Sequence, residues 1–166
     1  MSKRILVADD SDAVRRVVHT YLAERDFDVC GEAVDGKDAI EKARKLKPDL
    51  ILLDVAMPRT NGIEAASVLK DMVPGVRIVL FTMYSEAVAR TFPRNGLAVD
   101  AVIDKAQGVS SLAECVQRLI PQEVQPPESA SSGRSEETQA RYTPSEDSDK
   151  VRGEVFKRMF PDRPPK

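Results

Sequence analysis

Four short apolar runs mark the first 120 residues of the chain. They cover residues 5–8, 50–53, 78–81 and 101–103. Apolar runs of this length, bounded by polar residues, are typical of strands buried in a parallel sheet. The polar residues that follow them include Asp9 and Asp10, Asp54, Thr82 and Lys105. Because ligands bind beyond the carboxyl ends of the strands in an open parallel sheet, the pattern predicts that these five residues share one rim.

The segments between the runs repeat apolar residues with the period of an amphipathic helix. In chain order the repeats are Val14, Val17, Val18, Tyr21 and Leu22; Ala39, Ile40, Ala43 and Leu46; residues 63–69; and Leu112, Val116, Leu119 and Ile120. A shorter helix is expected over residues 85–92, where Pro93 ends it. Strands and helices therefore alternate along this part of the chain.

The alternation over residues 3–120 predicts an α/β domain, a parallel sheet with helices on both faces. Val29 and Cys30 form the centre of a short second strand, which brings the number of strand–helix repeats to about five. We expect one domain over residues 1–120, since 166 residues are too few for two domains of ordinary size.

The composition changes after Ile120. Residues 121–166 hold seven of the eleven prolines and are rich in Ser and Glu, a composition that cannot bury enough apolar surface to fold alone. We expect this tail to be mostly disordered. A short amphipathic helix near residues 149–160 is predicted from Val151, Val155, Phe156 and Met159, and either a transient helix or a docking motif would explain it.

The overall composition limits the partners of the chain. Its 25 basic and 27 acidic residues predict no general attraction to nucleic acid or to an anionic membrane. The apolar segment after Met1 is too short for a signal peptide or a membrane span. Cys30 and Cys115 lack companions at metal-ligand spacing, which favours structural thiols in a reducing cytoplasm and leaves a disulfide open. A cytoplasmic location is expected.

The five rim residues suggest phosphoryl chemistry. Asp9, Asp10 and Asp54 would repel one another without a cation, and Mg²⁺ is the hard ion that suits carboxylates and phosphoryl oxygens together. A carboxylate can also attack phosphorus and form an aspartyl phosphate. Lys105 could then pair with phosphoryl oxygens, and the Thr82 hydroxyl could donate a hydrogen bond to another.

Ordinary structural roles are the alternative for some of these residues. Asp9, Asp10 or Ser11 could simply cap the first helix, because short polar side chains are preferred at that position. His19 lies off the apolar stripe of its helix, so it is expected to face solvent without a functional role. The placement of the whole set at strand ends favours the chemical interpretation.

The chain resembles the receiver domains of bacterial two-component response regulators. The motifs that carry the resemblance are Ile5-Leu6-Val7-Ala8-Asp9-Asp10-Ser11, Asp54-Val55-Ala56-Met57-Pro58 with Asn61-Gly62, Phe81-Thr82-Met83-Tyr84, and Lys105. The resemblance spans residues 3 to about 120. It implies the flavodoxin-like (βα)5 fold of CheY-like proteins, a doubly wound parallel sheet with strand order 2-1-3-4-5.

The resemblance also implies a role for each rim residue. Asp54 would be the phosphoacceptor, and a histidine kinase, a phosphotransfer protein or a small acyl phosphate would phosphorylate it. Asp10, Asp54 and the main-chain carbonyl of Ala56 would bind Mg²⁺, with Asp9 acting mainly through water. Thr82 and Lys105 would bind the phosphoryl group, and small movements of their loops would signal that it is present.

Some positions differ from the family pattern. The residues around Thr82 are similar to those of LuxR/NarL-type regulators, and Ala106 follows Lys105 where proline is common. Val102 stands where many receivers have an aromatic residue, so an aromatic rotamer switch is not expected. Ala56 cannot orient an attacking water, and the bulky Tyr84 would screen the phosphoryl group. We therefore predict slow loss of the phosphoryl group.

Three functions are compatible with these residues. The first is a single-domain response regulator that signals by phosphorylation-gated binding to a downstream protein and catalyses only its own phosphorylation and dephosphorylation. The second is a truncated or diverged DNA-binding regulator of the LuxR/NarL type. Such a regulator needs a basic surface to contact DNA, whereas residues 121–166 contain eight basic and nine acidic residues. The third is an aspartyl-phosphate phosphatase, which would lack a general acid because Ala56 occupies its position. Dimerisation stays open.

Overall fold

A computed structural model describes residues 2–92 and 96–121, and in it five parallel strands form one sheet. The strands are β1 (Arg4–Ala8), β2 (Asp28–Ala33), β3 (Leu50–Leu53), β4 (Arg77–Thr82) and β5 (Ala101–Asp104). Their order across the sheet is β2-β1-β3-β4-β5, and every neighbouring pair is parallel. The strand order of the flavodoxin-like prediction is therefore confirmed.

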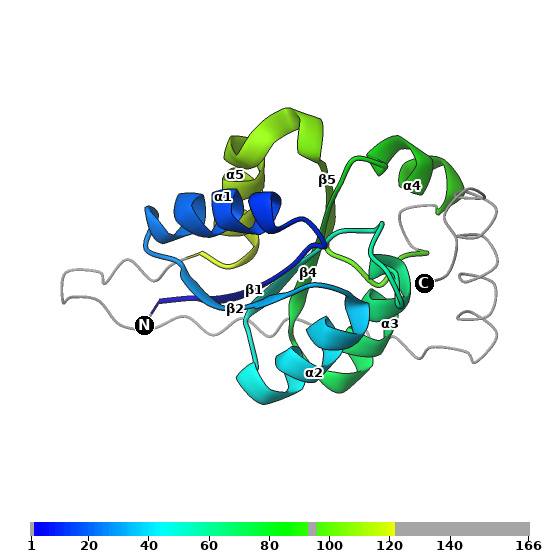
Figure 1. The fold of residues 1–166 in the computed structure, drawn as a ribbon, viewed down its shortest axis with the longest axis horizontal. Helices are drawn as coiled ribbons and strands as arrows, with labels where there is room; N and C mark the ends of the chain where they lie inside the picture. Colours follow the sequence, from blue (N-terminus) through cyan, green and yellow to red (C-terminus); the bar gives the residue numbers. More distant parts are fainter. Residues whose placement is uncertain (1, 93–95, 122–166) are drawn as a thin grey trace, which may run out of the picture.

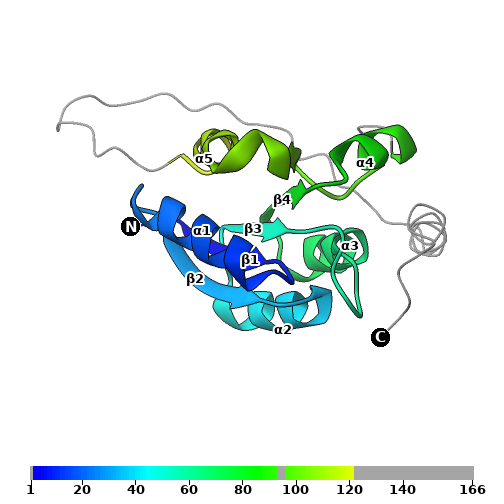
Figure 2. The same ribbon diagram turned by 45° about the horizontal axis from the view of Figure 1, so that its top comes forward.

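Helices cover both faces of the sheet (Figure 1). They are α1 (Asp12–Ala23), α2 (Gly36–Leu46), α3 (Gly62–Met72), α4 (Ser85–Thr91) and α5 (Gly108–Leu119), and one 3₁₀ turn, η1 (Lys105–Gln107), precedes α5. Figure 2 shows α1 and α5 on one side of the sheet and α2 on the other. This alternation of faces is what the right-handed crossovers of a doubly wound sheet produce.

The core is split by the sheet into two layers. Leu6 and Leu53 belong to the cluster under α2, α3 and α4, whereas Ile5 and Leu52 belong to the cluster under α1 and α5. All four residues of β3 are buried, since this strand lies at the centre of the sheet and is covered on both faces. Continuous apolar runs, rather than alternating ones, follow directly from this double coverage.

Two elements are longer than their sequence patterns predicted. The second strand extends beyond Val29 and Cys30 to the whole of Asp28–Ala33, and α3 extends beyond residues 63–69 to Gly62–Met72. The edge strand β2 is only partly buried, so it tolerates Glu32 and Gly31 and lacks a continuous apolar run. The short helix before Pro93 is confirmed as α4.

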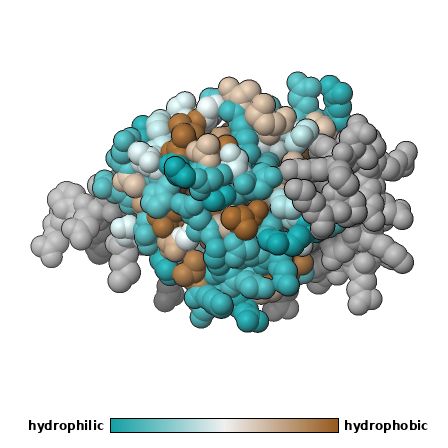
Figure 3. Space-filling view, in the orientation of Figure 1, coloured by the Kyte–Doolittle hydropathy of each residue, from teal (hydrophilic) through white to brown (hydrophobic). Residues whose placement is uncertain are grey.

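The face of the molecule in Figure 3 is mostly hydrophilic, with separate hydrophobic residues rather than one broad patch. In the described part of the chain, no helix is both long enough and apolar enough to cross a membrane. The predicted tail and its short helix near residues 149–160 lie outside the described residues.

Candidate functional site

The five predicted residues lie at the carboxyl ends of four strands. Asp9 and Asp10 follow β1, Asp54 follows β3, Thr82 is the last residue of β4, and Lys105 follows β5. Ala8 is aligned with Leu53 and Thr82 with Asp104, while Leu53 is aligned with Leu80, two residues before Thr82, so the strands end at the same edge of the sheet. The shared rim predicted from the apolar runs is therefore present.

Three carboxylates form the centre of the site. One oxygen from each of Asp9, Asp10 and Asp54 lies within 4.8 Å of the others. Asp9 and Asp54 are buried, whereas Asp10 is exposed to solvent. Three negative charges at this separation are unfavourable without a cation, so the cluster is suited to a hard divalent ion.

Lys105 joins two of these carboxylates. Its Nζ lies 2.6 Å from Asp9 Oδ2 and 3.2 Å from Asp54 Oδ2. Burial alone would lower the pKa of Lys105, but the hydrogen bond to Asp9 and the charges of Asp54 and Asp9 outweigh it and raise the pKa. The lysine is therefore a permanent cation at the rim.

Asp9 is buried and lies closer to Lys105 than Asp54 does. Burial raises its pKa, and the hydrogen bonds from Lys105 and from the Ser11 backbone offset that effect only in part. Its Oδ1 accepts a hydrogen bond from the Ser11 N–H at 2.9 Å. A cation placed beside Asp9 would favour the ionised form.

The second oxygen of Asp54 is the clearest sign of a ligand. Among the described residues, Asp54 Oδ1 is the one buried side-chain N or O atom that lacks a hydrogen-bond partner. A buried carboxylate oxygen without a partner is costly unless a metal ion or another group contacts it. The residues present therefore fit Mg²⁺, which takes one or two carboxylates and leaves positions for phosphoryl oxygens.

Thr82 is fully buried at the end of β4. Its Oγ1 accepts a hydrogen bond from the Tyr84 N–H at 3.3 Å, which leaves the hydroxyl proton for donation. The sequence analysis missed a link nearby, in which the Ser85 hydroxyl donates to the Asp104 carboxylate just before Lys105. This contact joins the loop after Thr82 to the loop that carries Lys105.

The loop from β3 to α3 is held tightly against Asp54. Asn61 caps α3, with its Oδ1 accepting from the N–H groups of Ile63 and Glu64. A Cβ on Gly62 would lie 2.1 Å from the Asp54 carbonyl oxygen, so only glycine fits there. Ala56 lies in this loop and is buried. Asn61-Gly62 thus fixes the backbone between the nucleophile candidate and α3.

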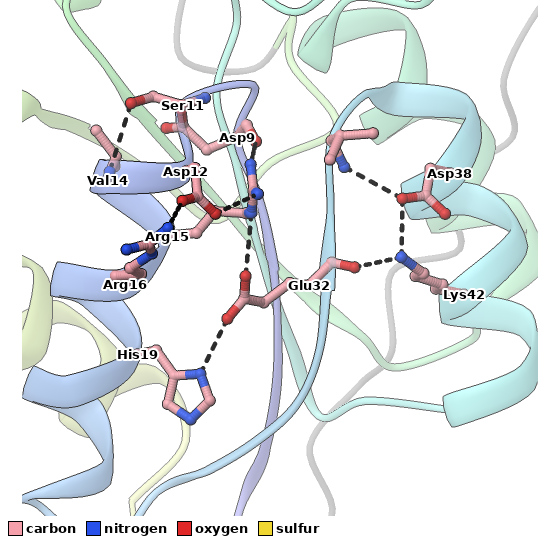
Figure 4. Close-up of polar contacts among 11 residues, drawn as sticks. Asp9, Ser11, Asp12, Val14, Arg15, Arg16, His19, Glu32, Asp38 and Lys42 are labelled. Carbon is pink, nitrogen blue, oxygen red and sulfur yellow. Dashed lines mark hydrogen bonds and ion pairs between the residues drawn. The ribbon is translucent and has the colours of Figure 1, made fainter.

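The capping alternative applies to Ser11 and not to the two aspartates. Ser11 is the N-cap residue of α1, and its hydroxyl accepts from the Val14 N–H (Figure 4). His19 is half exposed, but its Nδ1 lies 3.0 Å from Glu32 Oε1, a contact between α1 and β2 that its helical position did not predict. Val102 is a partly buried residue packed against the core.

Comparison with known proteins agrees with this geometry. A family model described as the response regulator receiver domain matches residues 5–117. The response regulator protein VraR of Staphylococcus saprophyticus is 39% identical over 119 residues, which make up 71% of this chain and 56% of that protein. The chain therefore matches little more than half the length of this relative.

Solved structures show the same fold. The response regulator domain of Thermotoga maritima CheB is 31% identical with a TM-score of 0.64, covering 72% of this chain and 96% of that domain. The response regulator TrrA of Thermotoga maritima, solved in complex with Mg²⁺ and BeF, is 30% identical with a TM-score of 0.63 and covers 71% of this chain and 99% of that protein.

Proposed function

The chain belongs to the response regulator receiver domain family, and from this membership we propose that Asp54 is its phosphoacceptor. Phosphorylation on aspartate is general for the family. The observation that carries the assignment is the buried, unpartnered Oδ1 of Asp54 inside a cluster that also contains Asp9, Asp10 and Lys105.

Receiver domains bind Mg²⁺ at an acidic pocket, and we assign that role here to Asp9, Asp10, Asp54 and the main-chain carbonyl of Ala56. The acidic cluster and the Mg²⁺–BeF complex of TrrA support the assignment. When bound, Mg²⁺ neutralises the carboxylates and the phosphoryl oxygens, so that the two negative groups can approach each other.

The protein's own residues position the transfer. The Asp54 carboxylate attacks phosphorus, a new O–P bond forms, and the bond to the donor imidazole or acyl oxygen breaks with its electron pair leaving on the donor. Lys105 turns from Asp54 towards a phosphoryl oxygen, because the Asp54 carboxyl group carries no negative charge once it is part of the acyl phosphate. The Thr82 hydroxyl donates to a second phosphoryl oxygen.

Response regulators of this kind interact with histidine kinases, and a histidine kinase or a phosphotransfer protein is the donor that we propose. For the output we propose phosphorylation-gated binding to a downstream protein. An apolar hollow of about 260 Å³ is lined by Val14, Val17 and Val109 and bordered by Lys105, and Val17 in it is exposed, so this surface beside the site supports a protein partner.

The two other functions have less support. Within residues 2–92 and 96–121 every helix belongs to the receiver fold, so this part of the chain contains no DNA-reading helix. A phosphatase acting on external substrates would need a general acid two residues after Asp54, and that residue is Ala56. The chain is therefore proposed as a signalling module that catalyses only its own phosphorylation and dephosphorylation.

Intact-protein mass after incubation with acetyl phosphate tests the phosphoacceptor. We expect an adduct that requires Mg²⁺, is stable in acid and labile in base, and is lost in Asp54→Asn. The matched control is Asp71→Asn, which makes the same chemical change at an exposed position on α3. An adduct that persists in Asp54→Asn, or the absence of any adduct in a protein that binds Mg²⁺, would contradict the assignment.

A further inference from the structure

Arg15 is a nearly buried cation on α1, directly behind the acidic pair. Its side chain is 11% exposed, and its Nη1 donates to the backbone carbonyl of Asp9 at 2.8 Å. Figure 4 shows the guanidinium lying between α1, Glu32 and the chain segment at Asp9. Arginine is rarely buried, and the three hydrogen bonds of this guanidinium hold the side chain in one position.

The carbonyl that Arg15 binds belongs to the peptide group that joins Asp9 to Asp10. The N–H of Asp9 is held by the Ala33 carbonyl at 3.0 Å in the last contact between β1 and β2. Beyond that point the chain leaves the sheet, and the contact from Arg15 sets the plane of the next peptide. Because a peptide group is planar, this plane fixes where the Cα of Asp10 lies and limits how its carboxylate can be aimed.

Two carboxylates hold the guanidinium in place. Arg15 Nε lies 3.0 Å from Glu32 Oε2, and Nη2 lies 3.0 Å from Asp12 Oδ1. The hydrogen bond with His19 lowers the pKa of Glu32, burial opposes this, and Arg15 lowers it further, so Glu32 remains a carboxylate. Since Glu32 and Asp12 balance the charge of Arg15, the arginine orients the Asp9–Asp10 peptide without neutralising the acidic cluster.

We propose that Arg15 is a positioning residue of the metal site, which holds the Asp9–Asp10 peptide in the geometry that binds Mg²⁺, and that Glu32 acts through Arg15. The inference rests on the proposed function, because it assumes that this cluster is the Mg²⁺ site. Partners that orient metal ligands contribute to metal affinity without touching the ion, and their loss typically weakens binding by about 10–100-fold.

The test is the Mg²⁺ dissociation constant of the full chain, measured by titration calorimetry without any phosphodonor. In Arg15→Gln we expect binding about tenfold weaker than in the wild type. At saturating Mg²⁺, phosphorylation by acetyl phosphate should return close to the wild-type rate, because the nucleophile and Lys105 are intact. An arginine with only a structural role would lower the melting temperature and leave the Mg²⁺ affinity unchanged.

Arg16→Gln is the matched control. It removes the same charge from the neighbouring residue of α1, but the Arg16 side chain is 76% exposed and, within residues 2–92 and 96–121, pairs with Asp12 and not with the Asp9 carbonyl. We expect wild-type Mg²⁺ affinity in this variant. A loss equal to that of Arg15→Gln would mean that net charge, rather than the contact with the Asp9 carbonyl, determines affinity, and it would overturn the proposal.

Glu32→Gln tests whether Glu32 acts through Arg15. This variant should weaken Mg²⁺ binding less than Arg15→Gln does, and the double variant should be no weaker than Arg15→Gln alone, because coupled residues are not additive. Additive losses would overturn this part. If Arg15→Gln does not fold, Glu32→Gln alone decides, and unchanged affinity there would contradict the proposal.

The two proposals fail in different ways. A wild-type chain that binds no Mg²⁺ would overturn the metal assignment and the positioning role with it. A wild type that binds Mg²⁺ while Arg15→Gln binds it equally well would overturn the positioning role alone. Loss of the adduct at Asp54 has no bearing on this titration, since no phosphodonor is present.

Discussion

Ala56 and Tyr84, which follow Asp54 and Thr82 by two residues each, are expected to affect the lifetime of the aspartyl phosphate. Ala56 is buried and has no polar side-chain atom that could orient a water molecule. Tyr84 is partly exposed and follows Thr82 by two residues, and we expect its bulky ring to screen the phosphoryl group. Hydrolysis needs a positioned water, so we expect these side chains to favour a long-lived phosphorylated state.

We predict that the purified aspartyl phosphate decays over minutes or longer, and that Ala56→Asn speeds the decay by about tenfold or more by supplying a polar group for the attacking water. The decay is followed by intact-protein mass after removal of the phosphodonor. Ala23→Asn, at the exposed end of α1, is the control and should decay at the wild-type rate. A wild-type lifetime of seconds would disprove the prediction.

At the scale of elements, the edge strand β5 is fastened at its start by Asp100. The Asp100 carboxylate accepts hydrogen bonds from the Ile78 N–H at 2.8 Å and from Lys70 on α3 at 2.7 Å, and Arg77 on β4 lies 2.9 Å away. Since Lys105 follows β5 directly, these contacts help to fix the strand that delivers the lysine to the rim.

Asp100 also gives a prediction about pH. Burial alone would raise its pKa, but Lys70, the Ile78 N–H and Arg77 together lower it below the ordinary value of 3.8. A lowered pKa in the folded state stabilises the protein above the ordinary value, and that stabilisation is lost as the pH falls from 3.8 through the lowered pKa.

Asp100→Asn should therefore lower the free energy of unfolding at neutral pH by about 1–3 kcal/mol. The difference from the wild type should shrink as the pH falls below the ordinary aspartate value. Urea unfolding at pH 7 and at successively more acidic values measures it, with Asp71→Asn as the exposed control. A difference independent of pH would show that the charge of Asp100 contributes nothing.

At the scale of the whole molecule, we propose that residues 1–120 form the receiver domain and that residues 121–166 are a separate tail. The described part of the chain already covers both faces of its sheet, and Ile120 is buried next to the end of α5. A domain with its own complete core is expected to fold without the rest of the chain.

A chain that ends at Pro121 should keep Mg²⁺-dependent phosphorylation at a rate within about twofold of the full chain, because a domain with its own core keeps its site. The rate with acetyl phosphate and the melting temperature, each compared with the full chain, test this. Aggregation or loss of the adduct in the shortened chain would mean that residues 122–166 contribute to the fold or to the site.

Much of the site could be predicted from strand ends alone. Parallel strands of similar length end at one edge, so Asp9, Asp54 and Thr82 had to lie near one another once their apolar runs were assigned to neighbouring strands. The period of the helices likewise follows from local spacing. The edge strand β2 was only partly predicted, because its half-exposed residues do not form an apolar run.

Other features depended on contacts between elements. Spacing along the chain does not predict the contacts of Arg15. This side chain donates to the Asp9 carbonyl and also to Glu32, which lies on β2, 17 residues further along the sequence. The unpartnered oxygen of Asp54 and the two ion pairs of Lys105 also required the packed structure. The sequence by itself determined which residues reach the rim, because that depends on local periodicity. Only the tertiary structure decided how those residues are held, because hydrogen bonds depend on distances between elements that sequence spacing does not contain.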